Sequence, residues 1–233
     1  MLDDNLNTDE VAKFSALAAT WWDPHGDSRT LHDINPCRLE FIATRSEIAG
    51  ARILDVGCGG GLLTEALTSR GGLVTGIDAA AAVVAVARGH AEAAGLAIDY
   101  AETTAEAYAE LHGAAFDTVV CMELIEHVPH PESLISACGR LLKPGGALFV
   151  STLNRTPSAY LEAILGAEYL LNLLPIGTHD YSRFITPAEL AEMFRANRLQ
   201  VRDVRGMRYN PLTRRASLVT NPRVNYLAYA RRD

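Results

Sequence analysis

Three glycines at alternate positions, Gly57, Gly59 and Gly61, constrain this chain more than any other feature. They follow the apolar run Ile53–Val56 and precede the helix-forming stretch Leu62–Ser69. Glycine permits a tight turn and lets a ligand approach the backbone closely. A strand, a glycine-rich turn and a helix in this order are typical of a nucleotide-binding βαβ unit, although such a turn can also serve only to join two elements.

Strand-like and helix-like stretches alternate through the middle of the chain. The expected strands are Ile53–Val56, Leu73–Ile77, Ala97–Ala101, Phe116–Met122 and Ala147–Thr152, followed later by the regions Gln200–Tyr209 and Val224–Ala230. The expected helices are Val11–Trp22, Leu62–Ser69, Ala79–Ala94, Glu132–Leu142, Tyr160–Leu174 and Pro187–Asn197. Alternation at this spacing predicts a Rossmann-like α/β fold, with a mostly parallel seven-stranded sheet and helices on both faces.

Length and composition fit one domain. A single hydrophobic core can support 233 residues, and 48% of them are hydrophobic. We therefore expect one domain over residues 1–233. Within it, residues 1–45 are expected to form a helical segment over the cofactor site, and residues 155–185 an apolar helical insertion on the substrate side.

Charge and cysteine content exclude several classes of protein. A net charge of −7 gives no general attraction to nucleic acid, so we expect no such partner. The four cysteines form no Cys-x-x-Cys pair, which argues against a zinc knuckle or a disulfide framework. Residues 1–10 are acidic and polar, and no apolar run is long enough to span a bilayer. These features predict a cytoplasmic protein that is at most attached to a membrane surface.

Two aspartates discriminate between nucleotide ligands. Asp78 ends the second expected strand, where its carboxylate can accept hydrogen bonds from ribose hydroxyls. A dinucleotide loop carries a third glycine at the place of Leu62. Asp55, beside the loop, would repel a pyrophosphate but suits the ammonium of a methionine moiety. The residues favour S-adenosylmethionine, with a nicotinamide dinucleotide as the alternative.

Further motifs lie outside the glycine loop. They are Val11-Ala12-Lys13-Phe14 through Trp21-Trp22, Leu31-His32-x-Ile34-Asn35-Pro36-x-Arg38, Cys121-Met122-Glu123-x-x-Glu126-His127-Val128-Pro129, Ser151-Thr152-Leu153-Asn154-Arg155, Gly166-Ala167-Glu168-Tyr169, Gly177-Thr178-His179-Asp180, Asn210-Pro211 and Val224-Asn225-Tyr226. Together they resemble the ubiquinone-biosynthesis O-methyltransferases over nearly the whole chain. The resemblance implies a class I S-adenosylmethionine-dependent methyltransferase that methylates a phenolic hydroxyl of polyprenyl-catechol and demethylubiquinol intermediates.

The resemblance also implies which residues contact the cofactor. The glycine loop and its flank suggest two further contacts. The implied contacts are Arg38, Gly57, Asp78 and Met122, and the added ones are Asp55 and Gly59. An arginine can hold the methionine carboxylate through paired hydrogen bonds, and a methionine can pack on adenine or ribose. From the residues alone, the more common role for Arg38 is a solvated surface residue, and a core position is favoured for Met122. Which residue of Glu102–Thr104 faces adenine stays open.

Glu123, Glu126 and His127 follow the fourth expected strand, where side chains face the substrate. A phenol has a pKa of about 10, so a base or a metal must help to remove its proton. If a helical turn begins at Glu123, the three residues share a face and can ligate a metal such as Mg²⁺. Alternatively, His127 is a general base oriented by Glu123 or Glu126, or the acids only stabilise a helix start. His127 and Glu123 are the candidate catalytic residues, and all three form the candidate metal site.

A polyprenyl phenol or quinol as substrate would require an apolar groove or shallow membrane contact. The leucine-rich stretch Tyr160–Leu174 either covers the core or provides that contact, and His179-Asp180 just beyond it either reaches the active site or lies on the surface. We expect peripheral contact at the inner face of the membrane and association with other ubiquinone-biosynthesis enzymes. The alternative functions are methylation of another small phenolic acceptor and a non-catalytic lipid-binding subunit of the same fold.

Overall fold

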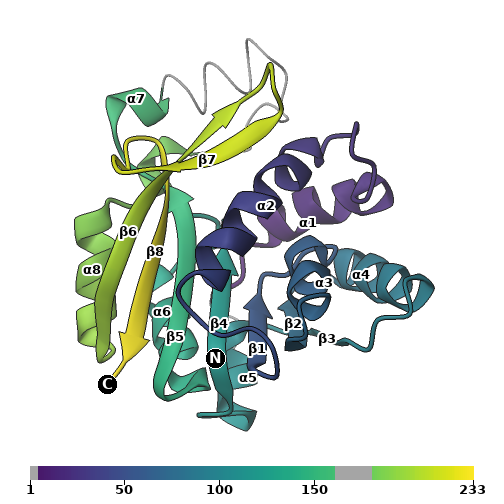
Figure 1. Ribbon diagram of the computed structural model, residues 1–233, viewed down its shortest axis with the longest axis horizontal. Helices are drawn as coiled ribbons and strands as arrows, with labels where there is room; N and C mark the ends of the chain where they lie inside the picture. The colour runs from purple at the N-terminus through teal and green to yellow at the C-terminus, as the bar shows by residue number, and fades with distance from the viewer. Residues whose placement is uncertain (1–4, 161–179) are drawn as a thin grey trace.

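An eight-stranded sheet forms the centre of the computed structural model, which describes residues 5–160 and 180–233 (Figure 1). The strand order is β3-β2-β1-β4-β5-β8-β6-β7. The strands are β1 (Arg52–Val56), β2 (Leu73–Asp78), β3 (Asp99–Glu102), β4 (Phe116–Met122), β5 (Leu142–Leu153), β6 (Leu199–Asn210), β7 (Arg215–Val219) and β8 (Asn225–Arg232). Strands β1 to β5 are parallel, and the remaining pairings are antiparallel. The Rossmann-like α/β class is confirmed, with one strand more than the seven expected.

Strand β7 is the one that the sequence did not predict. Its residues Arg215 and Ser217 are exposed and those between and after them are only partly buried. An edge strand of such mixed polarity lacks the apolar run that marks a buried strand. Arg214, just before β7, has a left-handed φ of 52° in the turn from β6. The β6–β7 hairpin therefore extends the sheet at its edge, where β7 contacts the second helix.

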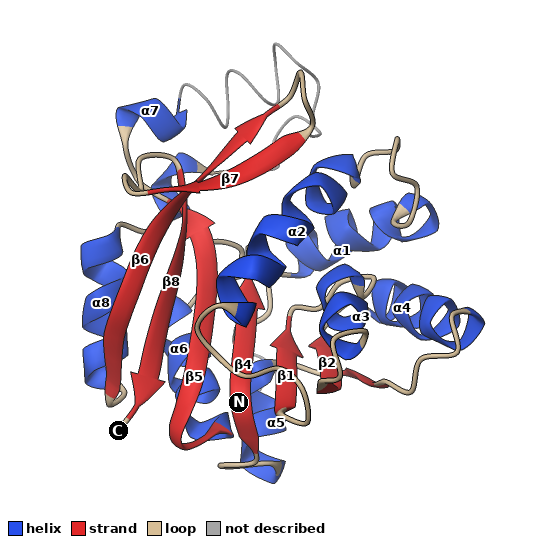
Figure 2. Cartoon of the chain, in the orientation of Figure 1, coloured by secondary structure: helices blue, strands red, loops and turns tan. Residues whose placement is uncertain are grey.

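Helices cover both faces of the sheet (Figure 2). They are α1 (Thr8–Leu17), η1 (Ala18–Thr20), α2 (Arg29–Ala43), α3 (Leu62–Thr68), α4 (Ala81–Ala93), α5 (Ala105–Leu111), α6 (Pro131–Leu141), α7 (Pro157–Ala159), η3 (Tyr181–Arg183) and α8 (Pro187–Ala196). Helices α5, α6 and α8 pack on one face, around residues such as Leu134 and Phe194. Helices α2 and α3 pack on the other, around Phe41 and Leu67.

The first helix is shorter than expected. Helix α1 ends at Leu17, whereas its pattern predicted a helix as far as Trp22. Trp21 is only 5% exposed, and Trp22 donates a hydrogen bond from Nε1 to the carbonyl of Gly60 at 2.9 Å. Both rings thus pack on the glycine loop and do not continue the apolar face of α1. The helical spacing of apolar residues in the sequence cannot indicate such a contact.

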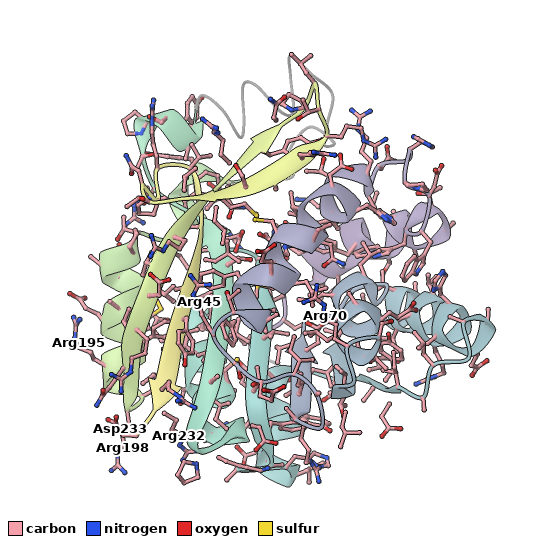
Figure 3. The ribbon with its side chains drawn as sticks, viewed as in Figure 1. Arg45, Arg70, Arg195, Arg198, Arg232 and Asp233 are labelled. Carbon is pink, nitrogen blue, oxygen red and sulfur yellow. The ribbon has the colours of Figure 1, made fainter. Side chains whose placement is uncertain are left out.

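Contacts with β6 fix the C-terminal end of helix α2 on the sheet. Arg45, labelled in Figure 3, lies just beyond the helix. It donates hydrogen bonds to Asp203 of β6 at 3.0 and 2.6 Å. The Arg45 guanidinium also lies 3.8 Å from the centre of the Phe41 ring. Arg38 lies about two turns earlier in the same helix, so these contacts fix its position relative to the strand ends.

Candidate active site

A cavity of about 820 Å³ opens at the carboxyl ends of the parallel strands. Residues at or just after the ends of β1, β2 and β4 line its floor. Helices α1 and α2 contribute one wall, and residues of β6, β8 and the loop before β8 contribute another. Open α/β sheets bind their ligands at this end, so the position alone marks it as a ligand site.

The glycine loop forms one end of the cavity. Gly57, Gly59 and Gly61 have φ values of 71°, 52° and 92°, in the left-handed region that side chains disfavour. A Cβ on Gly59 would lie 2.3 Å from the Trp21 ring. The loop therefore needs glycine both for its backbone conformation and for the close approach of the N-terminal segment.

Asp78 stabilises the loop from the end of β2. Its carboxylate accepts hydrogen bonds from the backbone N–H of Gly59 at 3.0 Å and of Ala80 at 2.9 Å. Burial raises the pKa of Asp78, and these backbone bonds oppose the shift. Asp78 lines the cavity together with Thr103 and Thr104, which lie at the end of the neighbouring β3. This arrangement suits a nucleoside, with a carboxylate for the ribose and two threonines next to it.

Asp55 is a buried carboxylate at the end of β1. It is 2% exposed and accepts a hydrogen bond from the Thr64 hydroxyl at 2.6 Å. Burial raises the pKa of Asp55 to about 6, while the Thr64 bond and the charge of Arg38 lower it. A cationic ligand would favour the ionised form. The predicted position beside the loop is confirmed, and its environment suits an ammonium group.

Arg38 reaches the cavity from α2 and is buried, so the surface interpretation is wrong. It forms an ion pair with Glu123, which follows β4. Burial lowers the pKa of Arg38 to about 10, opposed by the charges of Asp55 and Glu126. Met122, at the end of β4, packs in the core around Phe149 and also lines the same cavity, and its contact with the cofactor stays a prediction.

No helical turn begins at Glu123, although a common face for Glu123, Glu126 and His127 depended on one. Glu123 has a left-handed φ of 47°, and the turn closes with a hydrogen bond from His127 N–H to the Leu124 carbonyl. Glu126 is buried and accepts a hydrogen bond from the Thr152 hydroxyl at 2.8 Å. Glu123, Glu126 and His127 consequently point to different partners, and the prediction that they share one face is wrong.

This divergence bears on the metal hypothesis. A magnesium ion requires several oxygen ligands in one octahedral shell. Among residues 5–160 and 180–233, no group of three His, Cys, Asp or Glu side chains is placed to hold a metal ion. The three candidate ligands, as they lie, do not fit magnesium.

The partner of His127 comes from α1. His127 Nδ1 and the Glu10 carboxylate are 2.8 Å apart, and the Phe14 ring stands edge-on to the imidazole at 5.3 Å. The hydrogen bond to His127, together with Lys13, lowers the pKa of Glu10 to about 2. The sequence named Glu123 or Glu126 for this role. Glu10 was missed, and the only signal was its place directly before the motif that begins at Val11.

A second contact fixes the same two segments. Asn5 donates a hydrogen bond from Nδ2 to the His130 carbonyl at 3.0 Å and accepts one from the His130 N–H at 2.6 Å. The start of the described chain is thereby joined to the loop after β4, so α1 covers the cavity.

Two expectations concern the region after β5. Asp180 is exposed and accepts hydrogen bonds from Ser182, so it caps a short turn and does not line the cavity. His179 and residues 161–174 of the leucine-rich stretch lie outside the described residues. Tyr160, where that stretch begins, is 44% exposed.

The strand order, the loop and its acidic neighbours define an S-adenosylmethionine-dependent methyltransferase. A family model described as a methyltransferase domain matches residues 54–150. A solved magnesium protoporphyrin IX methyltransferase from Synechocystis, with bound SAH, has a TM-score of 0.68 at 19% identity, covering 97% of this chain and 94% of that one. A methyltransferase from Thermotoga maritima, described as a possible histamine N-methyltransferase, has a TM-score of 0.67 at 16% identity, covering 97% and 100%. These likenesses confirm the fold.

Comparison with curated sequences identifies the family, whereas the solved structures show only the fold. A ubiquinone biosynthesis O-methyltransferase of Nitrosococcus oceani is 55% identical over 225 residues, 97% of this chain and 95% of that protein. One from Pseudomonas aeruginosa is 51% identical over 229 residues, 98% of this chain and 99% of that protein. The chain belongs to the ubiquinone biosynthesis O-methyltransferases.

The Asp55 environment predicts a pH-dependent cofactor affinity. Its raised pKa of about 6 means that the carboxylate is ionised above pH 6 and neutral below it. Since only the ionised form attracts an ammonium, S-adenosylhomocysteine should bind up to about tenfold more weakly near pH 5 than near pH 7.5. Isothermal titration calorimetry at the two pH values measures this. Asp55→Asn should bind weakly at both, and a wild-type protein with equal affinities would contradict the assignment.

Proposed function

We propose that this chain transfers the methyl group of S-adenosylmethionine to a phenolic hydroxyl of polyprenyl-catechol and demethylubiquinol intermediates. The observation that carries the proposal is full-length identity of 51–55% to relatives named for ubiquinone biosynthesis. The cavity supports it, since the glycine loop and the acidic strand ends lie at one side and residues of β6 and β8 at the other. One cavity can thus hold a nucleoside-bearing cofactor next to a second molecule.

The cofactor end is assigned residue by residue. When bound, S-adenosylmethionine supplies an electrophilic methyl group on a sulfonium. Asp78 would accept hydrogen bonds from the ribose hydroxyls, and Asp55 would accept a hydrogen bond from the ammonium. Arg38 would donate hydrogen bonds to the methionine carboxylate. Met122 would pack against the adenosine, and Gly57 and Gly59 would leave room for it. Residues 1–45 would cover this site, as the contacts of Trp21 and Trp22 with the loop support.

His127 is our candidate for the general base. It lines the cavity and is 9% exposed, so an acceptor hydroxyl next to it would be shielded from water. With the Nδ1 hydrogen donated to Glu10, the basic nitrogen of the neutral ring is Nε2. Glu10 would then hold the tautomer and stabilise the imidazolium that forms when the phenol loses its proton.

Transfer itself is the first test. Purified protein with methyl-labelled S-adenosylmethionine and a short-tailed prenyl catechol should yield a labelled methyl ether. A catechol without the tail should react more slowly, because it lacks the apolar part of the acceptor. Scintillation counting after solvent extraction measures both. Cofactor binding without transfer to either acceptor would favour a non-catalytic subunit, and equal transfer to both would favour another small phenol as the substrate.

The Glu10–His127 pair predicts a catalytic defect without a cofactor defect. His127→Ala should lower kcat about 10²- to 10⁴-fold, the usual contribution of a general base, with little change in the Kd of S-adenosylhomocysteine. Glu10→Gln should lower kcat less, because the base remains but loses its anionic partner. Steady-state kinetics and calorimetry check both.

A matched control separates charge from position. Asp9 lies in the same first turn of α1 but is exposed, so Asp9→Asn changes the net charge equally without touching His127. It should keep wild-type kcat. If Glu10→Gln and Asp9→Asn behaved alike, Glu10 would have no role in positioning the base.

Contact with the membrane surface is a separate part of the proposal. In the described ranges, no helix is both long and apolar enough to cross a bilayer. Leu212, in the turn between β6 and β7, is 94% exposed, and the exposed Arg208 and Arg215 lie on the strands beside it. An apolar side chain flanked by arginines suits an anionic lipid surface. The hairpin would act together with the insertion over residues 155–185, whose place on the substrate side stays a prediction, as does association with other enzymes of the pathway.

Flotation of vesicles tests this contact. With vesicles containing about 30% anionic lipid, wild-type protein should float, and Leu212→Glu should float several-fold less, because it adds an anion to the contact. Leu111→Glu is the control, since Leu111 is 79% exposed at the end of α5, outside the hairpin. Wild-type protein that stays unbound, or an equal loss in both variants, would count against membrane contact through the hairpin.

A further inference from the structure

Arg38 and Glu123 form an ion pair inside the cavity that holds the glycine loop. Their side chains are 6% and 18% exposed, so the pair is largely shielded from water. A buried guanidinium requires an anionic partner. In this structure the protein itself supplies that partner, at the place where the proposed function puts the carboxylate of the cofactor.

The other carboxylates near Arg38 have partners of their own. Asp55 accepts a hydrogen bond from Thr64, and Glu126 accepts one from Thr152. Both act on the Arg38 guanidinium through space. Glu123 is the residue whose carboxylate makes the ion pair, so it is the one that an incoming carboxylate would meet.

The geometry points to a carboxylate exchange, in which Glu123 occupies on Arg38 the place of the methionine carboxylate and is displaced toward the acceptor when the cofactor binds. This inference rests on the proposed function, since it needs Arg38 to hold that carboxylate. A guanidinium fork matches one carboxylate in a bidentate arrangement. Two carboxylates on the same buried fork would repel each other, so one must leave.

The backbone of Glu123 is fixed, which limits the movement to its side chain. Its N–H donates hydrogen bonds to the carbonyl and to the hydroxyl of Ser151, each at 3.1 Å. These bonds join the end of β4 to β5 and hold Glu123 at its left-handed φ of 47°. Rotation about the side-chain bonds is therefore sufficient to remove the carboxylate from Arg38.

Asn225 provides a second partner for the displaced carboxylate. Its Nδ2 donates to Glu123 Oε1 at 3.3 Å, and it lies at the start of β8 on the wall of the cavity away from the loop. Its Oδ1 is buried and has no hydrogen-bond partner in the part of the chain that the structure describes. Glu123 thus lies between the guanidinium of Arg38, on the side of the glycine loop, and the amide of Asn225, on the opposite side of the cavity. Once Oε2 of Glu123 leaves Arg38, it would face the acceptor.

The exchange couples the two halves of the reaction. Without cofactor, the Glu123 carboxylate forms the ion pair with Arg38. With cofactor bound, this carboxylate can instead accept a hydrogen bond from a phenol. Bound cofactor should then increase acceptor affinity, and by thermodynamic linkage bound acceptor should increase cofactor affinity. Binding of S-adenosylmethionine and of the phenol would thus be positively cooperative.

Two ligands that differ in one group test the exchange. S-adenosylhomocysteine carries the carboxylate, and its decarboxylated analogue keeps the ammonium but lacks the carboxylate. Glu123→Gln should bind S-adenosylhomocysteine about tenfold more tightly than wild type does, because no anion has to be displaced. The decarboxylated analogue should bind no more tightly than to wild type. Isothermal titration calorimetry on the full chain measures the four constants.

Controls keep the outcomes distinct. Glu47→Gln makes the same charge change on an exposed loop residue and should leave both constants unchanged. Unaltered binding of S-adenosylhomocysteine to Glu123→Gln, or an equal change for both ligands, overturns the exchange. If Glu123→Gln does not fold, Glu123→Asp shortens the reach to Arg38 and should act in the same direction.

Arg38→Met separates failure of the exchange from failure of the cofactor assignment. It should weaken S-adenosylhomocysteine more than the decarboxylated analogue. If it does so while Glu123→Gln has no effect, the assignment of Arg38 stands and only the exchange is refuted. If it affects both ligands equally, or if wild-type protein binds neither, the cofactor assignment fails and the exchange fails with it.

Discussion

The buried guanidinium of Arg38 is the constraint on which the rest of the site depends. A cation removed from water destabilises the fold unless anions surround it, and the ends of β1 and β4 provide Asp55 and Glu123. Helix α2 must therefore lie where Arg38 meets both strand ends. Further contacts hold it there, since Asp33 of α2 accepts hydrogen bonds from Tyr209 of β6 at 2.7 Å and from Arg214 at 3.0–3.2 Å. The β6–β7 hairpin is thereby fixed to the helix that carries Arg38.

Much of the fold could be predicted because its strands are buried on both faces. In β4 and β5, nearly every residue of the inner part is buried, so each strand is a continuous apolar run that the sequence shows directly. β7 has no such run, since only one face of an edge strand meets the core. The glycine loop could be predicted for a related reason. A left-handed turn and a close approach require glycine, so the chemistry of the loop is visible in residue types at Gly57, Gly59 and Gly61.

The arrangement of the turn after β4 could not be predicted in the same way, because it depends on contacts between distant segments and on one backbone angle. Glu10 and His127 are separated by 117 positions, and nothing in a local pattern pairs them. The spacing of Glu123, Glu126 and His127 predicts a common face only if the backbone is helical. The left-handed φ at Glu123 prevents the helix, because it turns the chain out of the right-handed conformation at its first residue. A single dihedral angle therefore changes a candidate metal site into three side chains with separate partners.

The charges of the cavity also bear on how the product leaves. Burial raises the pKa values of Asp55 and Asp78, because the protein interior disfavours the charged form of each carboxylate. S-adenosylmethionine brings an ammonium and a sulfonium with its one carboxylate, and so offsets this anionic environment. Methyl transfer converts the sulfonium into a neutral thioether, and the ligand loses one positive charge while the protein keeps its acids. If Asp55 and Asp78 contact the cofactor as proposed, they would attract the charged cofactor more strongly than the neutral product. The electrostatics of the site would then favour exchange of the product for new cofactor.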